Sequence, residues 1–347
     1  MRLAIIGAGM AGLAAARRLR AERPELEVVI YEKSRGLGGR AATRRRATFV
    51  FDHGAQYFKT PTPELHRLVT QELSNTELFD IVKPVWTFDS AGTIAEGDPA
   101  QNADPKWGYR SGLSMLGKLL GVGLDVRQEV RISALRSGDE GVSRWQLVDD
   151  TGATLGTADY VLLTPPAPQT AEILQASDIP RERKAGFSAA MRSVVYRRCL
   201  SLAFGYARII HRPFYALVNT DRGHPISWVA LEHDKGVQRC PSEHSLLIAQ
   251  MAPQFSQDHW DLSLEQLTPI ITTQLGDLLA EDLDDPLWAD RQGWRYALPD
   301  GRADLAQLDA PDLGLFFAGD YTAGQGRVHL ALEQGWRAAE TIMAQSG

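Results

Sequence analysis

The sequence predicts an α/β fold in which the two ends of the chain build one parallel sheet. Near the amino terminus a short buried strand runs directly into a glycine-rich turn and a helix, and the same order returns near the carboxy terminus. A length of 347 residues suggests about two domains, so a second domain is expected between these ends. We expect that domain to be α+β, with a mixed sheet flanked by helices.

The composition is typical of a soluble globular protein and disfavours several function classes. Hydrophobic residues make up 44% of the chain and charged residues 23%, which excludes a mainly disordered protein. The net charge of −6 disfavours a general nucleic-acid binder, because such proteins need a basic face for phosphates. The longest nearly apolar run, 4–16, is too short for an integral membrane segment. Cys199 and Cys240 are too few for a disulfide framework, so we expect a reducing, cytoplasmic location.

The first predicted elements are a strand at Leu3–Ile6, a helix at 13–20 and a second strand at Glu27–Tyr31. Short apolar runs with β-branched residues are typical of buried parallel strands, and the segment between them places its apolar side chains on one side of a helix. Strand, helix and strand in this order predict a Rossmann-type unit with parallel strands.

A G-x-G-x-x-G turn joins the first strand to the helix, and an acid closes the second strand. Gly7 permits the tight turn, Gly9 lets a pyrophosphate approach the backbone, and Gly12 lets the helix pack closely on the strand. The start of the helix offers unpaired N–H groups to a phosphate. Glu32 can accept hydrogen bonds from ribose hydroxyls. The segment therefore predicts dinucleotide binding, with a glycine-rich turn that merely packs as the alternative.

A second glycine-rich loop follows Glu32 and contains Gly38, Gly39 and Arg40. Two adjacent glycines bring the backbone close to a ligand, and the arginine supplies a cation for a phosphate. Together with Thr43, this segment resembles the FAD-binding families grouped around monoamine oxidase, phytoene desaturase and protoporphyrinogen oxidase. Their pattern runs from the glycine fingerprint through an acid to Gly-Gly-Arg-x-x-Thr, so the resemblance implies that the dinucleotide is FAD.

The carboxy-terminal segment is similar to the end of the same families. A strand is predicted at Leu313–Ala318, followed by Gly319 and Asp320, and the last helix is predicted over Val328–Ala344. The resemblance implies that the aspartate contacts the ribityl–phosphate region of FAD. It also implies that the helix amino terminus points at the pyrimidine end of the flavin ring, where a helix dipole favours the negative charge of the reduced form.

The residues expected to bind FAD come from both ends of the chain and from segments between them. They are Gly7, Gly9, Met10, Ala11, Gly12, Glu32, Lys33, Gly38, Gly39, Arg40, His53, Gly54, Ala55, Gln56, Val130, Thr164, Gly319, Asp320, Arg327, Val328 and His329. Val130 is included because a valine backbone reads adenine in related folds. No cysteine lies near either flavin segment, so the expected FAD is non-covalent.

The segment Asp52–Phe58 indicates which branch of the FAD-binding families the sequence resembles. Its Asp-His-Gly-Ala-Gln-Tyr sequence, together with Gly-Gly-Arg, looks like the renalase branch. That likeness implies oxidation of a small-molecule reductant, a 2- or 6-dihydro isomer of reduced NAD(P), with O2 as acceptor and H2O2 as product. The flavin carries the chemistry, and the protein orients the substrate. The residues expected to do so are His53, Gln56, Tyr57 and Tyr296.

Other interpretations stay open. A flavin-containing amine oxidase or an isoprenoid desaturase-type oxidoreductase fits the FAD motifs, and a non-enzymatic flavin or NAD sensor is a third possibility. The histidines lack metal-binding spacing, so no metal site is expected. Arginines between 35 and 46 either attract phosphates or form a solvated loop. Candidate walls for a flat ring are Tyr57, Trp228, Trp294, Tyr296 and Tyr321.

The predicted organisation is a discontinuous FAD-binding domain with a substrate domain built from two insertions. The FAD-binding domain comprises 1–60, 106–175 and 291–347, and the substrate domain 61–105 and 176–290. Strands at Leu124–Val130 and Trp145–Val148 are expected to belong to a small β-meander. The other expected elements are strands at 48–51, Val85–Phe88, Cys199–Phe204, Ile226–Leu231 and Leu246–Ala249, and helices at Glu64–Leu73 and Leu264–Ala280.

Overall fold

A computed structural model describes residues 1–73, 75–138 and 143–345, and its contacts divide the chain into two compact units. Unit 1 comprises Met1–Arg40, Leu116–Tyr196 and Leu298–Gly347, and unit 2 comprises Ala41–Met115 and Arg197–Ala297. The predicted boundaries fell instead at 60, 105, 175 and 290. Residues 41–60 join unit 2 because Phe49 and Phe51 pack in its hydrophobic core. The assignment of a cofactor role and a substrate role to separate domains stays a prediction.

Unit 1 is built on a five-stranded parallel sheet, which confirms the predicted fold class. Its strands, in spatial order, are β19 (Leu315–Phe317), β13 (Tyr160–Leu163), β1 (Arg2–Ile6), β2 (Glu27–Glu32) and β9 (Asp125–Gln128). All four strand pairs are parallel. The central strands are apolar and buried, as expected for a parallel sheet.

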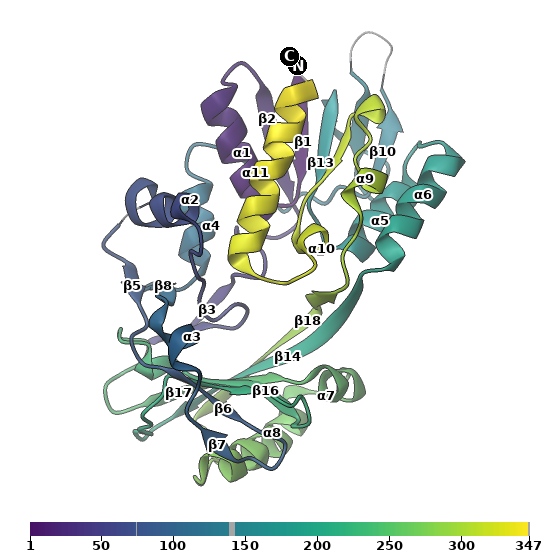
Figure 1. The fold of residues 1–347 in the computed structure, drawn as a ribbon. Helices are drawn as coiled ribbons and strands as arrows, with labels where there is room; N and C mark the ends of the chain where they lie inside the picture. Colours follow the sequence, from purple (N-terminus) through teal and green to yellow (C-terminus); the bar gives the residue numbers. More distant parts are fainter. Residues whose placement is uncertain (74, 139–142, 346–347) are drawn as a thin grey trace. The chain divides into compact units, whose positions relative to one another are not determined.

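Two long helices from opposite ends of the chain pack together in unit 1. Helix α1 (Met10–Glu22) and helix α11 (Val328–Gln345) lie side by side in Figure 1. A Cβ on Gly335 of α11 would lie 2.2 Å from the Ala11 carbonyl oxygen, so only glycine allows this close approach. The packing brings the two predicted cofactor segments into one body.

A small antiparallel sheet and several helices complete unit 1. The sheet contains β10 (Ala134–Ser137), β11 (Trp145–Val148) and β12 (Thr154–Ala158). The helices are α5 (Ala167–Ala176), α6 (Arg181–Arg192), α9 (Leu305–Leu308) and α10 (Asp320–Ala323), with a 3-10 turn at Pro311–Leu313. The meander prediction was right for Trp145–Val148 but wrong for Leu124–Val130. That segment forms β9, which pairs with β2 at the edge of the parallel sheet, and a pattern of apolar residues does not reveal the pairing partner.

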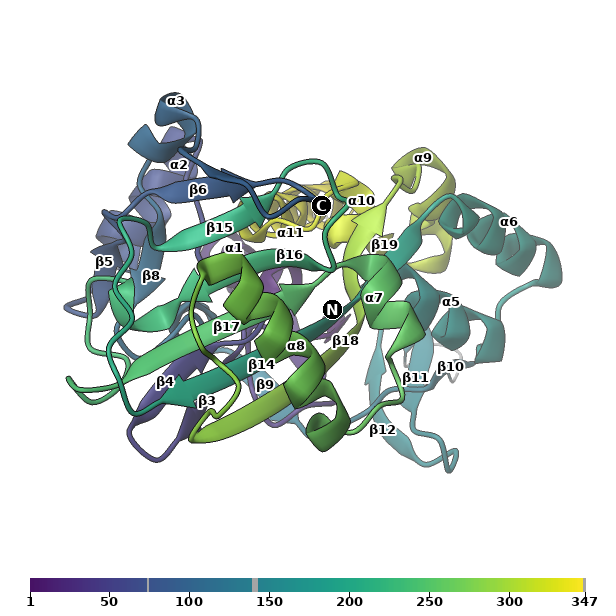
Figure 2. The same cartoon turned by 90° about the horizontal axis from the view of Figure 1, so that it is seen from below.

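Unit 2 contains a seven-stranded mixed sheet, also as predicted. Its order is β18 (Trp288–Asp300), β14 (Val195–Tyr206), β17 (Ser245–Met251), β16 (Ile226–Leu231), β15 (Ala216–Asn219), β6 (Val85–Phe88) and β7 (Ile94–Ala95). Strand β15 pairs parallel with β6, whereas β17 pairs antiparallel with β14 and β16. Helices α7 (Pro253–Asp258) and α8 (Leu264–Leu279) lie against one face of the sheet (Figure 2), where α8 buries Leu267, Ile271 and Leu275.

Unit 2 also contains several short elements outside this sheet. They are β3 (Thr43–Arg46), β4 (Phe49–Asp52), β5 (Leu78–Asp80), β8 (Trp107–Tyr109), α3 (Pro99–Ala103) and a 3-10 turn at Glu232–Asp234. The helix predicted at Glu64–Leu73 is α2 (Pro63–Arg67) continued by a π-helical turn at Leu68–Glu72. Helix α4 (Ser114–Leu120) follows β8.

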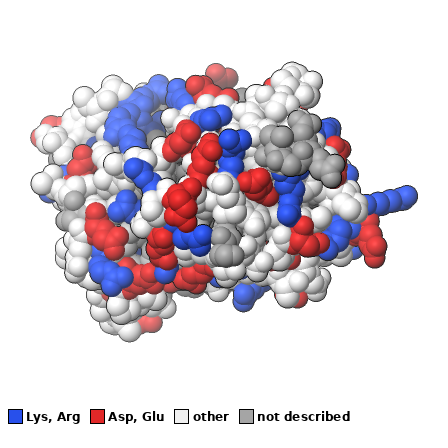
Figure 3. All heavy atoms as spheres, turned by 90° about the horizontal axis from the view of Figure 1, so that it is seen from above, with Lys and Arg blue, Asp and Glu red and all other residues white. Residues whose placement is uncertain are grey.

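Two further features concern the distribution of charge on the surface and the length of the apolar helices. Basic and acidic side chains are intermixed on the face drawn in Figure 3. Within 1–73, 75–138 and 143–345, no helix is long and apolar enough to cross a lipid bilayer.

Candidate functional site: a glycine cradle and a buried charge network

The first glycine-rich turn of unit 1 has open space beside Gly9 and close neighbours beside Gly7 and Gly12. A Cβ on Gly12 would lie 2.1 Å from the Gly7 carbonyl oxygen, which is why α1 can start so close to β1. Gly7 has a φ of +101°, and its Cβ would lie 2.6 Å from Thr164 Oγ1. Nothing lies within 4 Å of a Cβ placed on Gly9. Gly9 is also the N-cap of α1 and provides no side-chain hydrogen bond, so the helix amino terminus faces this open space.

The carboxylate of Glu32 stabilises this turn through hydrogen bonds. The side chain is buried, and its two oxygens accept hydrogen bonds from the backbone N–H groups of Ala8 at 2.7 Å and Ser34 at 2.8 Å. The backbone N–H of Val130 donates to the Glu32 carbonyl at 2.9 Å. The structure therefore brings Glu32 and Val130 to the turn, and the acid has a structural role besides the expected ribose contact.

The Gly38–Gly39 loop lies directly against the first turn. Gly38 donates its N–H to the Ala8 carbonyl at 2.9 Å, and Gly38 and Gly9 form an isolated parallel bridge. A Cβ on Gly117 of α4 would lie 2.7 Å from the Gly38 backbone. Two glycine-rich segments thus lie directly against each other, and we call them the glycine cradle (Gly7–Gly12 and Gly38–Gly39).

Arg40 ends this loop and forms an ion pair with Asp320 from the far end of the chain. The Arg40 Nη1 to Asp320 Oδ2 distance is 2.5 Å, and Asp320 is 4% exposed. The Tyr196 hydroxyl donates to Asp320 Oδ1 at 2.8 Å. Burial, followed by the charge of Asp320, raises the pKa of Tyr196, so the hydroxyl stays protonated and acts as a donor.

The other carboxy-terminal candidates lie around the start of α11. Arg327 is exposed, while Val328 and His329 form the half-buried first turn of that helix. Gly319 has a φ of +149°, in the region that favours glycine, and precedes α10. Tyr321, a candidate ring wall, is instead fully buried in the core of unit 1 and donates its hydroxyl to the Leu163 carbonyl at 3.2 Å.

These residues fit a bound dinucleotide. The space in front of Gly9 and the uncapped start of α1 together form the usual setting for a pyrophosphate, and Arg40 adds a cation that lies next to a buried acid. The described residues contain no group of three or more metal-ligating side chains that could hold a metal ion.

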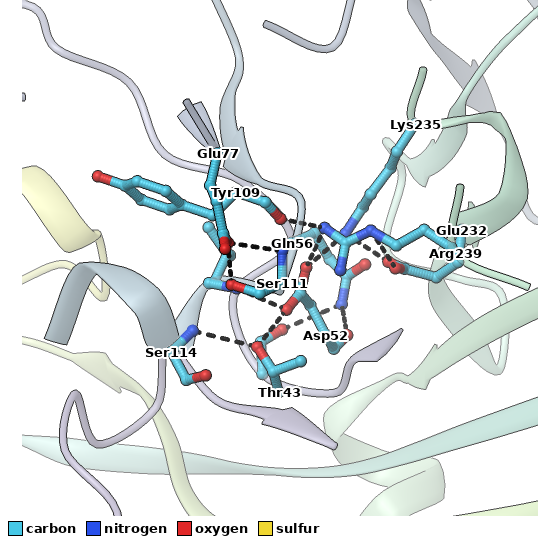
Figure 4. A network of polar contacts seen from close by, with 12 residues as sticks. Thr43, Asp52, Gln56, Glu77, Tyr109, Ser111, Ser114, Glu232, Lys235 and Arg239 are labelled. Atoms are coloured by element: carbon cyan, nitrogen blue, oxygen red, sulfur yellow. Dashed lines mark hydrogen bonds and ion pairs between the residues drawn. The ribbon is translucent and has the colours of Figure 1, made fainter. Parts of the chain in front are cut away.

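The Asp52–Phe58 segment lies in unit 2 and begins in a buried charge network (Figure 4). Asp52 is completely buried, and its Oδ2 atom lies 2.9 Å from Lys235 Nζ and 3.3 Å from Arg239 Nη2. Its Oδ1 atom accepts hydrogen bonds from Thr43 Oγ1 at 2.6 Å and from the backbone of Leu113 at 2.8 Å. Burial works to raise the pKa of Asp52, but Lys235 and Arg239 outweigh it and hold the pKa below its usual value.

Glu232 is the fourth charge of this network. It pairs with Lys235, and its Oε2 lies 4.0 Å from Arg239 Nε. Burial raises the pKa of Glu232, because its pairing with the two cations offsets the loss of water only in part. Arg239 also donates to the Tyr109 carbonyl at 2.8 Å. Two carboxylates and two cations therefore lie in one buried cluster, in which Asp52 receives more donors than Glu232.

The residues after Asp52 are held by side chains that bind their carbonyl groups. Trp294 Nε1 donates to the His53 carbonyl at 2.8 Å and Gln250 Nε2 to the Gly54 carbonyl at 2.6 Å. Gln56 Nε2 donates to the carbonyls of both Asp52 and Gly54. Side chains from three positions therefore constrain the backbone of this segment.

His53 is neutral in this setting. Its ring stacks on Trp294, with centroids 5.4 Å apart and planes 12° apart. Burial first, and then the nearby cation of Arg44, lower the pKa of His53 to about 4. Tyr57 packs near Trp228, with ring centroids 6.1 Å apart, and Tyr296 is half-buried on β18.

Sequence reasoning missed several residues of these two regions. Tyr196, Lys235 and Arg239 carry no motif, and the aspartates that they contact, Asp320 and Asp52, lie 124 to 187 positions away in the chain. Thr164 was expected to contact the cofactor, and its hydroxyl lies within hydrogen-bond distance of the Ile6 and Gly7 carbonyls, at 2.8 and 3.1 Å. A spacing such as Lys235-x-x-x-Arg239 gives no sign of burial.

Comparison with known protein families identifies the family to which this protein belongs. Residues 5–71 match the model of an NAD(P)-binding Rossmann-like domain, and residues 90–343, more than half of the chain, match the model of a flavin containing amine oxidoreductase. This chain belongs to the flavin-containing amine oxidoreductase family. It is therefore an FAD-dependent oxidoreductase, which confirms the predicted cofactor and enzyme class.

Solved structures support the same fold for this amine oxidoreductase. A protein assigned as a protoporphyrinogen oxidase from Exiguobacterium sp. 255-15 is similar with a TM-score of 0.78 at 16% identity. Wild-type putrescine oxidase bound to putrescine gives 0.73 at 16%, and cyclohexylamine oxidase from Brevibacterium oxydans IH-35A gives 0.75 at 14%. Each match covers 99% of both chains. At these identities the likeness concerns the fold, and the substrate must be argued from the residues.

Proposed function

We propose that this enzyme oxidises isomeric dihydronicotinamide dinucleotides, the 2- and 6-dihydro forms of NAD(P), to NAD(P)+. The proposal rests on the Asp52–Tyr57 segment, whose residues match the renalase pattern and whose backbone is locked by Trp294, Gln250 and Gln56. In the balanced reaction, the dihydronicotinamide, O2 and one proton give NAD(P)+ and H2O2. Bound FAD supplies the hydride acceptance and the transfer of two electrons to O2.

The residues that would hold FAD are those of the glycine cradle and its surroundings. The amino terminus of α1 and the space before Gly9 suit the pyrophosphate, and Glu32 and Val130 suit the adenosine end. Arg40 would balance the charge of the phosphates. The other expected contacts are Gly7, Met10, Ala11, Gly12, Lys33, Gly38, Gly39, His53, Gly54, Ala55, Gln56, Thr164, Gly319, Asp320, Arg327, Val328 and His329.

We infer that the FAD is non-covalent. Both cysteines are free, and each belongs to unit 2. Burial raises the pKa of Cys199 to about 12 and that of Cys240 to about 11, so both thiols stay protonated. Because the thiolate is the nucleophile, neither side chain is suited to a bond with the flavin.

The charges around His53 favour a reductant whose reacting ring is uncharged over a protonated amine. Arg44 is close enough to lower the pKa of His53, and the acid of the motif, Asp52, is compensated by Lys235 and Arg239. Arg44 is paired with Asp290, and Asp52 with Lys235 and Arg239, so neither carboxylate is left for an ammonium ion. A dihydronicotinamide ring carries no charge, and hydride departure from it requires no protein base. We expect His53, Gln56, Tyr57 and Tyr296 to orient this ring.

The test is a substrate survey on the purified yellow protein under air. The 2- and 6-dihydro isomers of NAD(P) are expected to give H2O2 and NAD(P)+ in equal amounts over many turnovers. Primary amines, isoprenoid desaturase substrates and ordinary NADPH are expected to give far less peroxide. Turnover of amines with no reaction of the dihydro isomers would overturn the proposal.

Amine oxidation is the second candidate, because two of the similar folds belong to amine oxidases. Those enzymes act on putrescine and cyclohexylamine according to their names. The same survey separates the two candidates, since amine turnover releases an aldehyde or a ketone and dihydronicotinamide turnover does not. A protein that binds FAD but turns over no reductant would instead indicate a sensor.

A further inference from the structure

The Asp320 carboxylate is unusual for its place beside an expected diphosphate. It is 4% exposed, so it keeps little water, and an uncompensated buried acid would repel an anionic cofactor. Both of its oxygens have a side-chain donor: Arg40 Nη1 at 2.5 Å and the Tyr196 hydroxyl at 2.8 Å. Both Arg40 and Tyr196 therefore stabilise the buried carboxylate of Asp320.

Tyr196 contacts both members of the ion pair. Its hydroxyl donates to Asp320, and its ring centroid lies 5.9 Å from Arg40 Cζ, within the range of a cation–π interaction. A phenylalanine would keep the contact of the ring and lose the hydrogen bonds of the hydroxyl. The tyrosine hydroxyl thus fixes the direction of the Asp320 carboxylate, and the carboxylate in turn fixes the Arg40 guanidinium.

We propose that Tyr196 is a positioning residue for FAD, acting through Asp320 and Arg40. Tyr196 is also the second residue of β14 (Val195–Tyr206), a strand of the seven-stranded sheet. Cofactor binding therefore holds the start of β14 in place through the same hydroxyl. The inference rests on the proposed contacts of Arg40 and Asp320 with FAD and is independent of the identity of the reductant.

The experiment compares Tyr196→Phe with Tyr160→Phe. The Tyr160 hydroxyl belongs to the same unit but donates to the Gln345 carbonyl at 3.3 Å, away from Asp320. Full-length apoproteins are titrated with FAD, and flavin fluorescence is followed. Because hydrogen bonds to charged groups are the stronger ones, Tyr196→Phe is expected to weaken FAD binding about tenfold, whereas Tyr160→Phe leaves it unchanged. Unchanged affinity in Tyr196→Phe, or equal loss in both variants, would overturn the proposal.

A second measurement separates positioning from general packing. In an Asp320→Asn background, Tyr196→Phe is expected to have little further effect on FAD affinity, because the two side chains act in series. Hydrogen exchange of the peptide 193–199 is expected to slow on FAD addition in the parent protein and in Tyr160→Phe, and to slow much less in Tyr196→Phe. Additive losses, or FAD protection that persists in Tyr196→Phe, would contradict the proposal. All of these readouts can be obtained if no tested reductant is turned over.

Discussion

The glycine cradle of unit 1 and the charge network of unit 2 differ in how their polar groups are used. The cradle omits side chains: an added Cβ at Gly9 would meet nothing, and the start of α1 has no side-chain cap. The network surrounds its central acid with side chains and donors, because Asp52 is completely buried and receives four donors. The cradle leaves the start of α1 without a side-chain cap, so its N–H groups are available to a ligand. The network pairs its charged side chains with one another and so stabilises the segment from Asp52 to Gln56.

This difference predicts that substitutions in the network act mainly on stability, and that substitution of Gly9, the open glycine of the cradle, acts mainly on cofactor binding. The largest effect is expected for Lys235→Met, which leaves Asp52 and Glu232 with one cation. Removing one partner from a buried ion pair costs about 3–5 kcal/mol, so the free energy of unfolding is expected to fall by that amount in denaturant titrations.

Two matched variants test the cause of this loss. Lys83→Met breaks a more exposed pair, with Asp234 at 2.9 Å, and is expected to cost less than about 1 kcal/mol. The double variant Glu232→Gln/Lys235→Met removes one charge of each sign and is expected to recover most of the lost stability. A double variant less stable than Lys235→Met would contradict the account of charge balance.

Two glycines of the cradle sharpen the comparison. Gly12→Ala places a Cβ 2.1 Å from the Gly7 carbonyl oxygen and is expected to lower the unfolding free energy of the apoprotein by about 3 kcal/mol. Gly9→Ala meets no atom and is expected to leave that free energy nearly unchanged while weakening FAD binding about tenfold or more. Strong FAD binding by Gly9→Ala would show that the pyrophosphate does not approach this glycine.

The pH dependence of stability is expected to contain a contribution from His53. Its pKa in the native protein is about 4, below the ordinary value of 6.5, so the unfolded chain binds a proton first as the pH falls. The stability from this group is complete above about pH 6.5, decreases as the pH falls and is lost near pH 4, with a total of about 3 kcal/mol.

His53→Gln tests this contribution, with the exposed His211→Gln as control. The first substitution is expected to flatten the curve of unfolding free energy against pH between about 6.5 and 4, and the second to leave the curve as it is. An equally steep curve in His53→Gln would assign the pH dependence to other groups.

The smallest expected effect concerns the side chain that holds the His53 backbone. Trp294→Phe keeps an aromatic ring for stacking but removes the N–H donor to the His53 carbonyl. Loss of one such hydrogen bond costs about 1 kcal/mol of stability. Thermal unfolding of the holoprotein measures it, and a loss as large as that of Lys235→Met would mean that the indole contributes mainly through packing.

The local geometry of the cradle could be predicted because its signals are local, and the FAD contacts of its residues stay a prediction. Gly7, Gly9, Gly12 and Glu32 have their roles within one strand–turn–helix–strand segment, where spacing and geometry are linked directly. The edge strand β9 was placed in the wrong sheet, since pairing between strands depends on partners that are distant in the sequence.

The charge network could not be predicted for the same reason. Asp52 lies 183 residues from Lys235 and 187 from Arg239, and a pattern of charged residues usually indicates an exposed loop. The motif identified Asp52 through a family resemblance, but only the fold shows that its charge is compensated. The Tyr196–Asp320 contact, across 124 residues, was likewise beyond local patterns.

The most direct test of the proposed chemistry is a single anaerobic mixing experiment. Purified protein with bound FAD is mixed with 6-dihydro-NAD(P), and the visible absorption of the flavin is followed in a stopped-flow instrument. The account predicts rapid and complete bleaching with formation of one NAD(P)+ per flavin. A flavin that stays oxidised with 6-dihydro-NAD(P), yet bleaches with a primary amine, would contradict it.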